Sequence, residues 1–180
     1  MRLMTAALAM ASMTIAGCAT VDDSSPGHAD HAAPDQGMTP TERGAYVQMA
    51  GASDLYEIQS SRIALEKSRN QDVRQFAQML TEHHTKTTQT LMAAAKTAGL
   101  QPPPPVLMPM QRDMLAQLQQ ADAAGFDQVF LRQQVRAHEM ALALHQNYAR
   151  AGDTPALKTA ASTAVPIIEQ HLTRARQLNR

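Results

Sequence analysis

Apolar residues recur at spacings of three and four positions in four long stretches between residue 41 and the C-terminus. This is the period of one face of an α-helix. We therefore expect long helices over about 41–68, 71–98, 123–150 and 154–178, and a shorter one at about 110–120. Helices of about 25 residues would each be roughly 40 Å long. Four of them joined by short and long connections predict an all-α fold, a four-helix bundle with a short extra helix between the second and third long helices.

Glycine and proline mark the ends of these stretches. Gly99 is expected to stop the second helix, and the run 102–105 consists of four prolines, which requires extended chain. The run 152–155, Gly-Asp-Thr-Pro, would end one helix and start the next. Thr41 and Glu42 offer capping groups where order should begin. Pro166 lies inside the last helix and is expected to kink it.

The N-terminus has a different pattern. Met1-Arg2 is followed by an apolar run too short to span a bilayer, and the run ends in Ile15-Ala16-Gly17-Cys18. These four residues resemble the lipobox of bacterial lipoproteins, in which the cysteine is acylated and becomes the first residue of the mature chain. We expect residues 1–17 to be a lipoprotein signal peptide and Cys18 to be the lipidation site. An ordinary signal peptide with a coincidental cysteine is the alternative.

Residues 18–40 are rich in Ser, Pro, Gly and Asp and contain almost no large apolar side chain. Such a segment cannot repay the entropy of ordering, so we expect a flexible tether that connects the lipid to a single domain at 41–180. His28 and His31 in this tether would hold a divalent metal weakly or simply be solvated. By analogy with sorting in enteric-type bacteria, Ala19 after the cysteine favours the outer membrane, so the expected location is the cell envelope, facing the periplasm.

Composition narrows the classes of function. The formal charge is zero, and removal of residues 1–17 would take away Arg2 and no acidic residue. A near-neutral surface gives no reason to expect nucleic acid as a partner. Cys18 is the only cysteine, so no disulfide within the chain can support the fold. The expected partners are the membrane, through the lipid at Cys18, and another protein of the envelope.

One ionisable residue interrupts the apolar stripe of each long helix near its middle: Glu57, His84, His138 and His171. Each lies about 12 to 16 residues from the tight turn that joins its pair of helices, so the four belong to about the same level of the bundle. Helical side chains lean toward the N-terminus of their own helix, which brings the members of each antiparallel pair closer together. Buried charges require partners, so we expect these four side chains to meet.

Two interpretations of this cluster remain open. Three imidazoles and a carboxylate suit zinc, copper, iron or nickel rather than calcium or magnesium. Alternatively, Glu57 accepts hydrogen bonds from the histidines in a polar network that sets the helix register without a metal. Two other histidines, His83 and His145, are expected at the rim of the cluster or in solvent.

Several methionines follow the proline run. Met108, Met110 and Met114 resemble a cluster of soft donors for a metal such as copper, although apolar anchoring of the loop explains them equally well.

Motifs on all four long helices resemble the bacterial domain-of-unknown-function 4142 family over about 45–178. They are Leu55-Tyr56-Glu57-Ile58, Phe76 to Leu80 continuing through His84-Thr85-Lys86, Phe126-Asp127 through Gln134-Val135 and His138, and Pro166 with His171-Leu172. The resemblance implies export and a ferritin-like bundle, and it brings no established activity. The chain departs from the family at two positions. Gln59 stands where the family usually has a second glutamate, and His83 stands where it often has an acidic residue.

The residues three positions before the central histidines are Thr81, Val135 and Ile168. A di-iron site of the ferritin type needs Glu-x-x-His on two helices, so its chemistry is not expected here. The chain also shows no nucleophile triad or phosphate-binding loop. We therefore expect a non-catalytic, lipid-anchored envelope protein that acts in partner binding or envelope stress. The alternative functions are a metal-binding or redox bundle that uses the four central residues, and a hydrolase that uses a bound metal and water.

Overall fold

The structure, a computed structural model, describes residues 39–180 and contains five helices and no strand in that range. The all-α prediction is therefore confirmed. The helices are α1 (Arg43–Lys67), α2 (Gln71–Thr97), α3 (Pro109–Gln120), α4 (Phe126–Ala151) and α5 (Pro155–Leu178). Within this part of the chain, none of the helices combines the length and apolar character that crossing a membrane would need.

Local side-chain chemistry sets the helix ends within a few residues of the expected positions. Glu42 begins α1, and its carboxylate accepts hydrogen bonds from the backbone N–H groups of Gly44 and Ala45, both at 2.8 Å. Gly99 ends α2 with φ 73°, a conformation that suits glycine, so its expected role as a stop is confirmed. α4 begins later than expected because Asp122 accepts a hydrogen bond from Gly125 N–H at 2.7 Å, which holds a turn before the helix.

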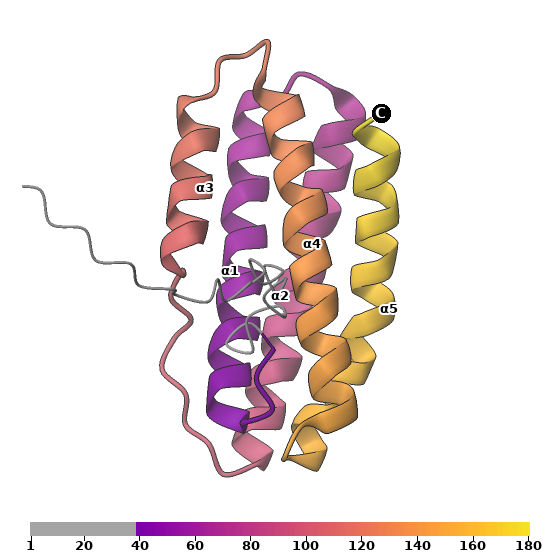
Figure 1. Ribbon diagram of the computed structural model, residues 1–180. Coiled ribbons are helices and arrows are strands. Elements are labelled where there is room, and N and C mark those ends of the chain that lie inside the picture. The colour runs from indigo at the N-terminus through magenta and orange to yellow at the C-terminus, as the bar shows by residue number, and fades with distance from the viewer. Residues whose placement is uncertain (1–38) are drawn as a thin grey trace, which may run out of the picture. The chain divides into compact units, whose positions relative to one another are not determined.

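The four long helices form a ring in which α1 contacts α2 and α4, and α5 contacts the same two helices (Figure 1). α3 lies outside the ring against α1 and α4. Figure 1 shows α1 and α5 running in one direction and α2 and α4 in the other. Every pair of neighbours in the ring is thus antiparallel. The proline-rich connection and α3 carry the chain back along the ring, which is why α4 runs parallel to α2, a point the sequence leaves open.

The proline-rich connection packs closely on α1 at Gly51. A Cβ atom at this position would lie 3.1 Å from Cγ of Pro105, tighter than ordinary contact. Glycine inside a helix costs roughly 0.5–1 kcal/mol relative to alanine. The close approach of the proline segment accounts for a glycine in the middle of α1.

Two apolar clusters fill the ends of the ring and leave a polar layer between them. One cluster includes Phe76, Leu80 and Phe130, and the other includes Leu91 and Leu157. On α2 the first cluster ends at Leu80 and the second begins at Leu91, so the residues between them belong to the middle layer. Each large side chain that is fully buried contributes roughly 1.5–3 kcal/mol of burial free energy. The two clusters therefore hold the helices together on both sides of the polar layer.

Lys67, the last residue of α1, caps the C-terminal end of α3. Its ammonium group donates hydrogen bonds to the carbonyls of Leu118 at 3.1 Å, Gln119 at 2.7 Å and Ala121 at 2.6 Å. These carbonyls have no partner within the helix, and a cation is favourable at this end of the helix dipole. Lys67 therefore fastens α3 to the ring.

We predict that Lys67→Met lowers the free energy of unfolding by about 1–3 kcal/mol, because carbonyls at the end of α3 lose their donor. The matched control is Lys86→Met, which removes an exposed lysine whose only polar partner among residues 39–180 is Glu82, at 3.5 Å. Its expected effect is below about 1 kcal/mol. Urea unfolding followed by circular dichroism measures both. Equal effects of the two substitutions would contradict the capping role of Lys67.

Candidate metal centre

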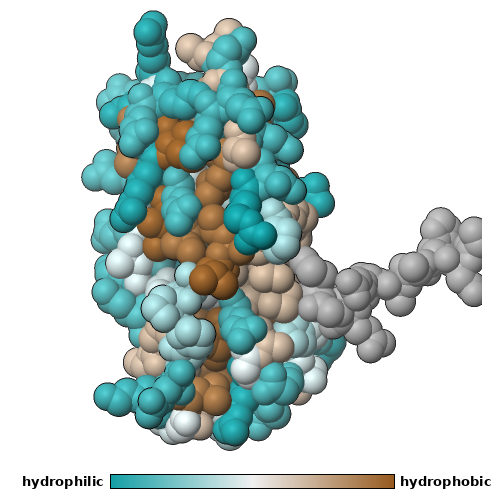
Figure 2. Space-filling view, turned by 90° about the vertical axis from the view of Figure 1, so that its left-hand side faces the viewer, coloured by the Kyte–Doolittle hydropathy of each residue, from teal (hydrophilic) through white to brown (hydrophobic). Residues whose placement is uncertain are grey.

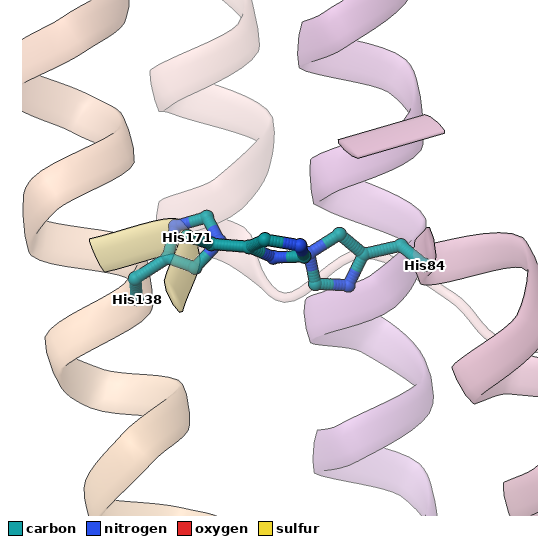
Figure 3. Close-up of side chains that lie close together, drawn as sticks. All are labelled: His84, His138 and His171. Atoms are coloured by element: carbon teal, nitrogen blue, oxygen red, sulfur yellow. The ribbon is translucent and has the colours of Figure 1, made fainter. Parts of the chain in front are cut away.

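The structure places all four central residues in the interior. The exposed fractions are 1% for Glu57, 3% for His84, 1% for His138 and 0% for His171. Figure 3 shows the three imidazole rings pointing toward one another from α2, α4 and α5. One ring nitrogen of each histidine lies within 4.8 Å of the corresponding atoms of the other two. The three histidines thus form a buried cluster that we call the histidine cluster.

The proton positions on His138 follow from its partners. Its Nδ1 lies 2.8 Å from the carbonyl oxygen of Gln134, one turn earlier on α4. A carbonyl only accepts, so Nδ1 carries the hydrogen and Nε2 has a free lone pair. This Nε2 is 3.3 Å from Nδ1 of His171. The ring of His138 is therefore oriented by its own helix so that its lone pair faces His171.

His171 is held from the other side by His83. Nε2 of His171 and Nδ1 of His83 are 2.8 Å apart, and the two rings are stacked. Two proton arrangements satisfy this pair. His171 either donates from Nδ1 to His138 and accepts from His83, or it donates outward to His83 and leaves its Nδ1 lone pair facing His138. The second arrangement places two lone pairs at 3.3 Å, a separation that a cation between them would stabilise.

A carboxylate orients His84. Its Nδ1 is 2.8 Å from Oδ1 of Asp54, and Asp54 also accepts hydrogen bonds from the hydroxyls of Thr87 and Thr88, each at 2.9 Å. Nε2 of His84 is buried and has no hydrogen-bond partner within residues 39–180. Because the carboxylate accepts from Nδ1, it leaves Nε2 available as a metal ligand, which is the common arrangement in carboxylate–histidine–metal sites.

Asp54 is a residue of the site that the sequence analysis did not single out. It lies in the α1 stripe three positions before Glu57 and is 6% exposed. The presence of a second acidic residue in the apolar stripe of α1 was the sequence signal that could have identified Asp54. Its contact with α2 depends on the rotation of α1 about its axis, which periodicity does not give.

Glu57 lies beside the histidine cluster rather than among its three nitrogens. Its Oε1 is 3.8 Å from Nδ1 of His138, the nitrogen that faces away from His171. Neither carboxylate oxygen has a hydrogen-bond partner in the described part of the chain. Burial raises the pKa of Glu57 to about 7, with the charge of His84 acting in the opposite direction. Glu57 is thus a buried carboxyl group close to its ionisation midpoint at neutral pH.

Burial also sets the charge of the histidines. Burial, together with the charge of neighbouring histidines, lowers the pKa of His138 to about 3 and the pKa of His171 to about 2. Burial acts in the same direction on His84, but the hydrogen bond and charge of Asp54 outweigh it and raise its pKa. His138 and His171 are therefore neutral at pH 7, the form in which imidazole binds a metal.

The prediction that His145 lies at the rim or in solvent is wrong. Its side chain is buried, at 7% exposed, and Nδ1 lies 3.0 Å from the hydroxyl of Tyr46. Burial lowers its pKa to about 4. Tyr46 supplies the polar partner that allows a histidine to stay in the core. His83, by contrast, is half-buried at the edge of the histidine cluster, as expected. The predicted lipidation site, Cys18, and the two histidines of the predicted tether, His28 and His31, lie outside the described residues.

The fold and the site together define an all-helical domain with a buried histidine cluster. The chain belongs to the family described as domain of unknown function DUF4142, whose model matches residues 28–178. None of the curated proteins matches it.

Solved structures of other helical proteins resemble this chain. A DUF305 fragment from Deinococcus radiodurans is 19% identical with a TM-score of 0.67, and the match covers 78% of this chain and 96% of the fragment. CopM in the Cu(I)-bound form is 17% identical with a TM-score of 0.63, covering 76% of this chain and 94% of CopM. CopM in the Cu(II)-bound form is 15% identical with a TM-score of 0.63, covering 77% and 95%. At these identities the likeness establishes the fold alone.

We predict that Glu57→Gln stabilises the metal-free protein at pH 8 and changes little near pH 4. The folded state holds a proton on Glu57 up to a pKa of about 7, whereas the ordinary value is 4.5. The unfolded chain binds fewer protons between these values, so stability falls as the pH rises from 4.5 past 7. The full difference corresponds to about 3 kcal/mol at pH 8.

The measurement is urea unfolding in the presence of EDTA from pH 4 to 8. Glu82→Gln is the control, because Glu82 is exposed and the same neutralisation should leave the pH profile unchanged. A Glu57→Gln profile parallel to the wild type at every pH would show that Glu57 ionises normally in the folded protein.

Proposed function

We propose that this protein binds one transition-metal ion through His84, His138 and His171, with Glu57 as a nearby buried carboxylate. The observation that carries the proposal is the approach of one nitrogen from each of these three buried imidazoles to within 4.8 Å of the other two. The separation of 3.3 Å between His138 and His171 suits two ligands of one ion with bonds of about 2.0–2.1 Å. Nε2 of His84 is buried and has no hydrogen-bond partner in the described residues. Buried polar atoms normally have a partner, and a bound metal ion would be one for this nitrogen.

Residues around the histidine cluster orient the three imidazole rings. Asp54, Gln134 and His83 each contact the outward nitrogen of one histidine, which orients its ring, and Asp54 and Gln134 also place the proton on that nitrogen. Such partners increase the basicity of the ligands and commonly affect metal affinity by 10–100-fold. Glu57 would balance part of the charge of the ion in a layer that otherwise excludes water. A bound ion would supply positive charge and, for copper or iron, a redox couple.

The donor set favours copper, zinc or iron over calcium or magnesium, because neutral imidazole is a poor ligand for the latter two. Copper is supported further by the structures of CopM in its Cu(I)- and Cu(II)-bound forms, which share the fold. We therefore rank copper first. The carboxylate-rich Glu-x-x-His pattern of di-iron proteins is absent from the described helices, which speaks against iron–oxygen chemistry.

The arrangement of the helices supports a ferritin-like four-helix bundle. α1, α2, α4 and α5 form the ring, and α3 is the extra helix in the long connection. In such bundles, metal sites are built in the core from side chains on facing helices. This is the position of the histidine cluster.

We also propose that the domain acts in the cell envelope, on a lipid anchor at Cys18 and a tether over 18–40. The support comes from the sequence: a basic start, a short apolar run and the lipobox-like tetrad. An outer-membrane anchor facing the periplasm would place a metal-binding domain where it meets metal ions, and another envelope protein would be its partner. The proposed role is binding rather than catalysis.

We predict that the full chain, stripped of metal and titrated with Cu(II) or Zn(II), retains one equivalent after dialysis. His138→Gln and His171→Gln each remove a ligand and should abolish retention. His145→Gln is the matched control, because it also replaces a buried histidine but one bonded to Tyr46 outside the histidine cluster. Elemental analysis measures the metal, and circular dichroism checks folding. Failure of the folded wild-type protein to retain any transition metal would refute the site and leave the polar network as its explanation.

We further predict that Cys18→Ser moves the protein from the membrane fraction to the soluble fraction of bacterial cells, because the acyl chains are attached to this thiol. Fractionation with immunoblotting measures the change, and mass spectrometry of the wild-type N-terminus should detect the lipid. Ser12→Ala, inside the apolar run, is the control and should leave the protein in the membrane. A Cys18→Ser protein that stays in the membrane fraction would argue for another mode of anchoring.

A further inference from the structure

A second candidate site lies on the side of the molecule that carries α3. A pocket of about 390 Å³ opens between α1, α3 and α4. Figure 2 looks onto this side and shows a band of hydrophobic residues between hydrophilic ones. Met108, just before α3, is one of the two large hydrophobic residues of the described chain that are exposed, at 42%. The pocket is thus open to solvent and mainly apolar.

Methionine is concentrated around this pocket. Of the seven methionines at positions 39–180, five line it: Met49, Met108, Met110, Met114 and Met140. They come from α1, from the chain just before α3, from α3 itself and from α4. Met110 and Met114 are four residues apart on α3 and so share one face. Thioethers from four separate segments therefore border a single open space.

The other residues of the pocket offer few competing donors. No carboxylate and no imidazole lines it. The hydroxyl of Tyr56 already donates to Gln133 at 2.9 Å, and the side-chain oxygen of Gln111 accepts from the N–H of Met108 at 2.8 Å. Hard cations need oxygen ligands, and zinc prefers imidazole or thiolate. Apart from the hydroxyl of Ser53, the donor set consists of thioether sulfur, which selects soft ions.

We propose that this pocket, which we call the methionine pocket, binds a soft monovalent cation, Cu(I) or Ag(I), through its thioether sulfurs. It uses none of the residues of the histidine cluster and would be a separate site. A monovalent ion fits the apolar lining better than a divalent one, because the cost of moving a charge out of water rises steeply with the charge.

Arg136 modulates this site. Its Nη2 donates a hydrogen bond to the sulfur of Met110 at 3.6 Å. The guanidinium group therefore competes with an ion for this sulfur and places a positive charge at the pocket. The side chain is exposed and can move into solvent. Its charge opposes a bound cation, so Arg136→Gln should increase the affinity for the ion. A pocket that bound only apolar molecules would not respond in this direction.

The test is a titration of the full chain with silver nitrate, followed by NMR of ¹³C-labelled methionine methyl groups. Cys18→Ser is present throughout so that no thiol competes. We expect the methyl signals of the pocket methionines to shift with the first equivalents of silver, while those of Met79 and Met92, which do not line the pocket, stay in place. Met110→Leu combined with Met114→Leu removes two sulfurs, nearly conserves volume and should lose one bound equivalent.

The double substitution Met79→Leu with Met92→Leu is the matched control and should keep that equivalent. The proposal is refuted if the pocket signals do not move, if the control loses as much silver as the pocket variant, or if Arg136→Gln weakens binding. The same titration of His138→Gln should produce the same shifts of the pocket signals as in the wild-type protein, because His138 does not line the pocket. A failure of the histidine cluster to bind metal therefore does not affect this test.

Discussion

The structure depends on a polar layer that is buried between two apolar clusters. Glu57, His84, His138 and His171 cannot be hydrated there, and each needs a partner from another helix or from its own backbone. Phenylalanine and leucine side chains on both sides of the layer supply the burial free energy that keeps the ring of helices closed. The layer in turn restricts how the helices can slide or rotate, because a shift would separate buried polar groups from their partners.

The outward contacts of the histidines link this structural role to the proposed binding role. Asp54, the carbonyl of Gln134 and His83 each occupy one ring nitrogen, so the other nitrogen of each ring faces the common centre. A site organised in this way loses little entropy when it binds an ion. The buried oxygens of Glu57 and Nε2 of His84 have no partner in the described residues; a cation at the histidine cluster would be a partner for Nε2 and would compensate the charge of the nearby Glu57 carboxylate.

The two candidate sites differ in chemistry because they differ in surroundings. The histidine cluster is closed, offers nitrogen and has carboxylates nearby, which suits a divalent ion or either oxidation state of copper. The methionine pocket is open and offers sulfur without any carboxylate, which suits only soft monovalent ions. The imidazole nitrogens of the first site are ligands of intermediate softness and the thioethers of the second are soft, so the two sites can be tested separately.

The sequence by itself determined the helical class, the helix bounds within a few residues and the burial of the four central residues, because these follow from local periodicity and from glycine and proline chemistry. Tertiary structure decided the rest. The direction of α4 depends on whether the proline-rich connection and α3 together span the length of the ring before α4 begins. The pairing of Asp54 with His84 and of His145 with Tyr46 depends on the rotation of each helix about its axis. The gathering of five methionines around one pocket depends on where α3 docks. A period of 3.6 residues shows which face of a helix is buried, but which side chains meet across the interior is set by the packing of all the helices together.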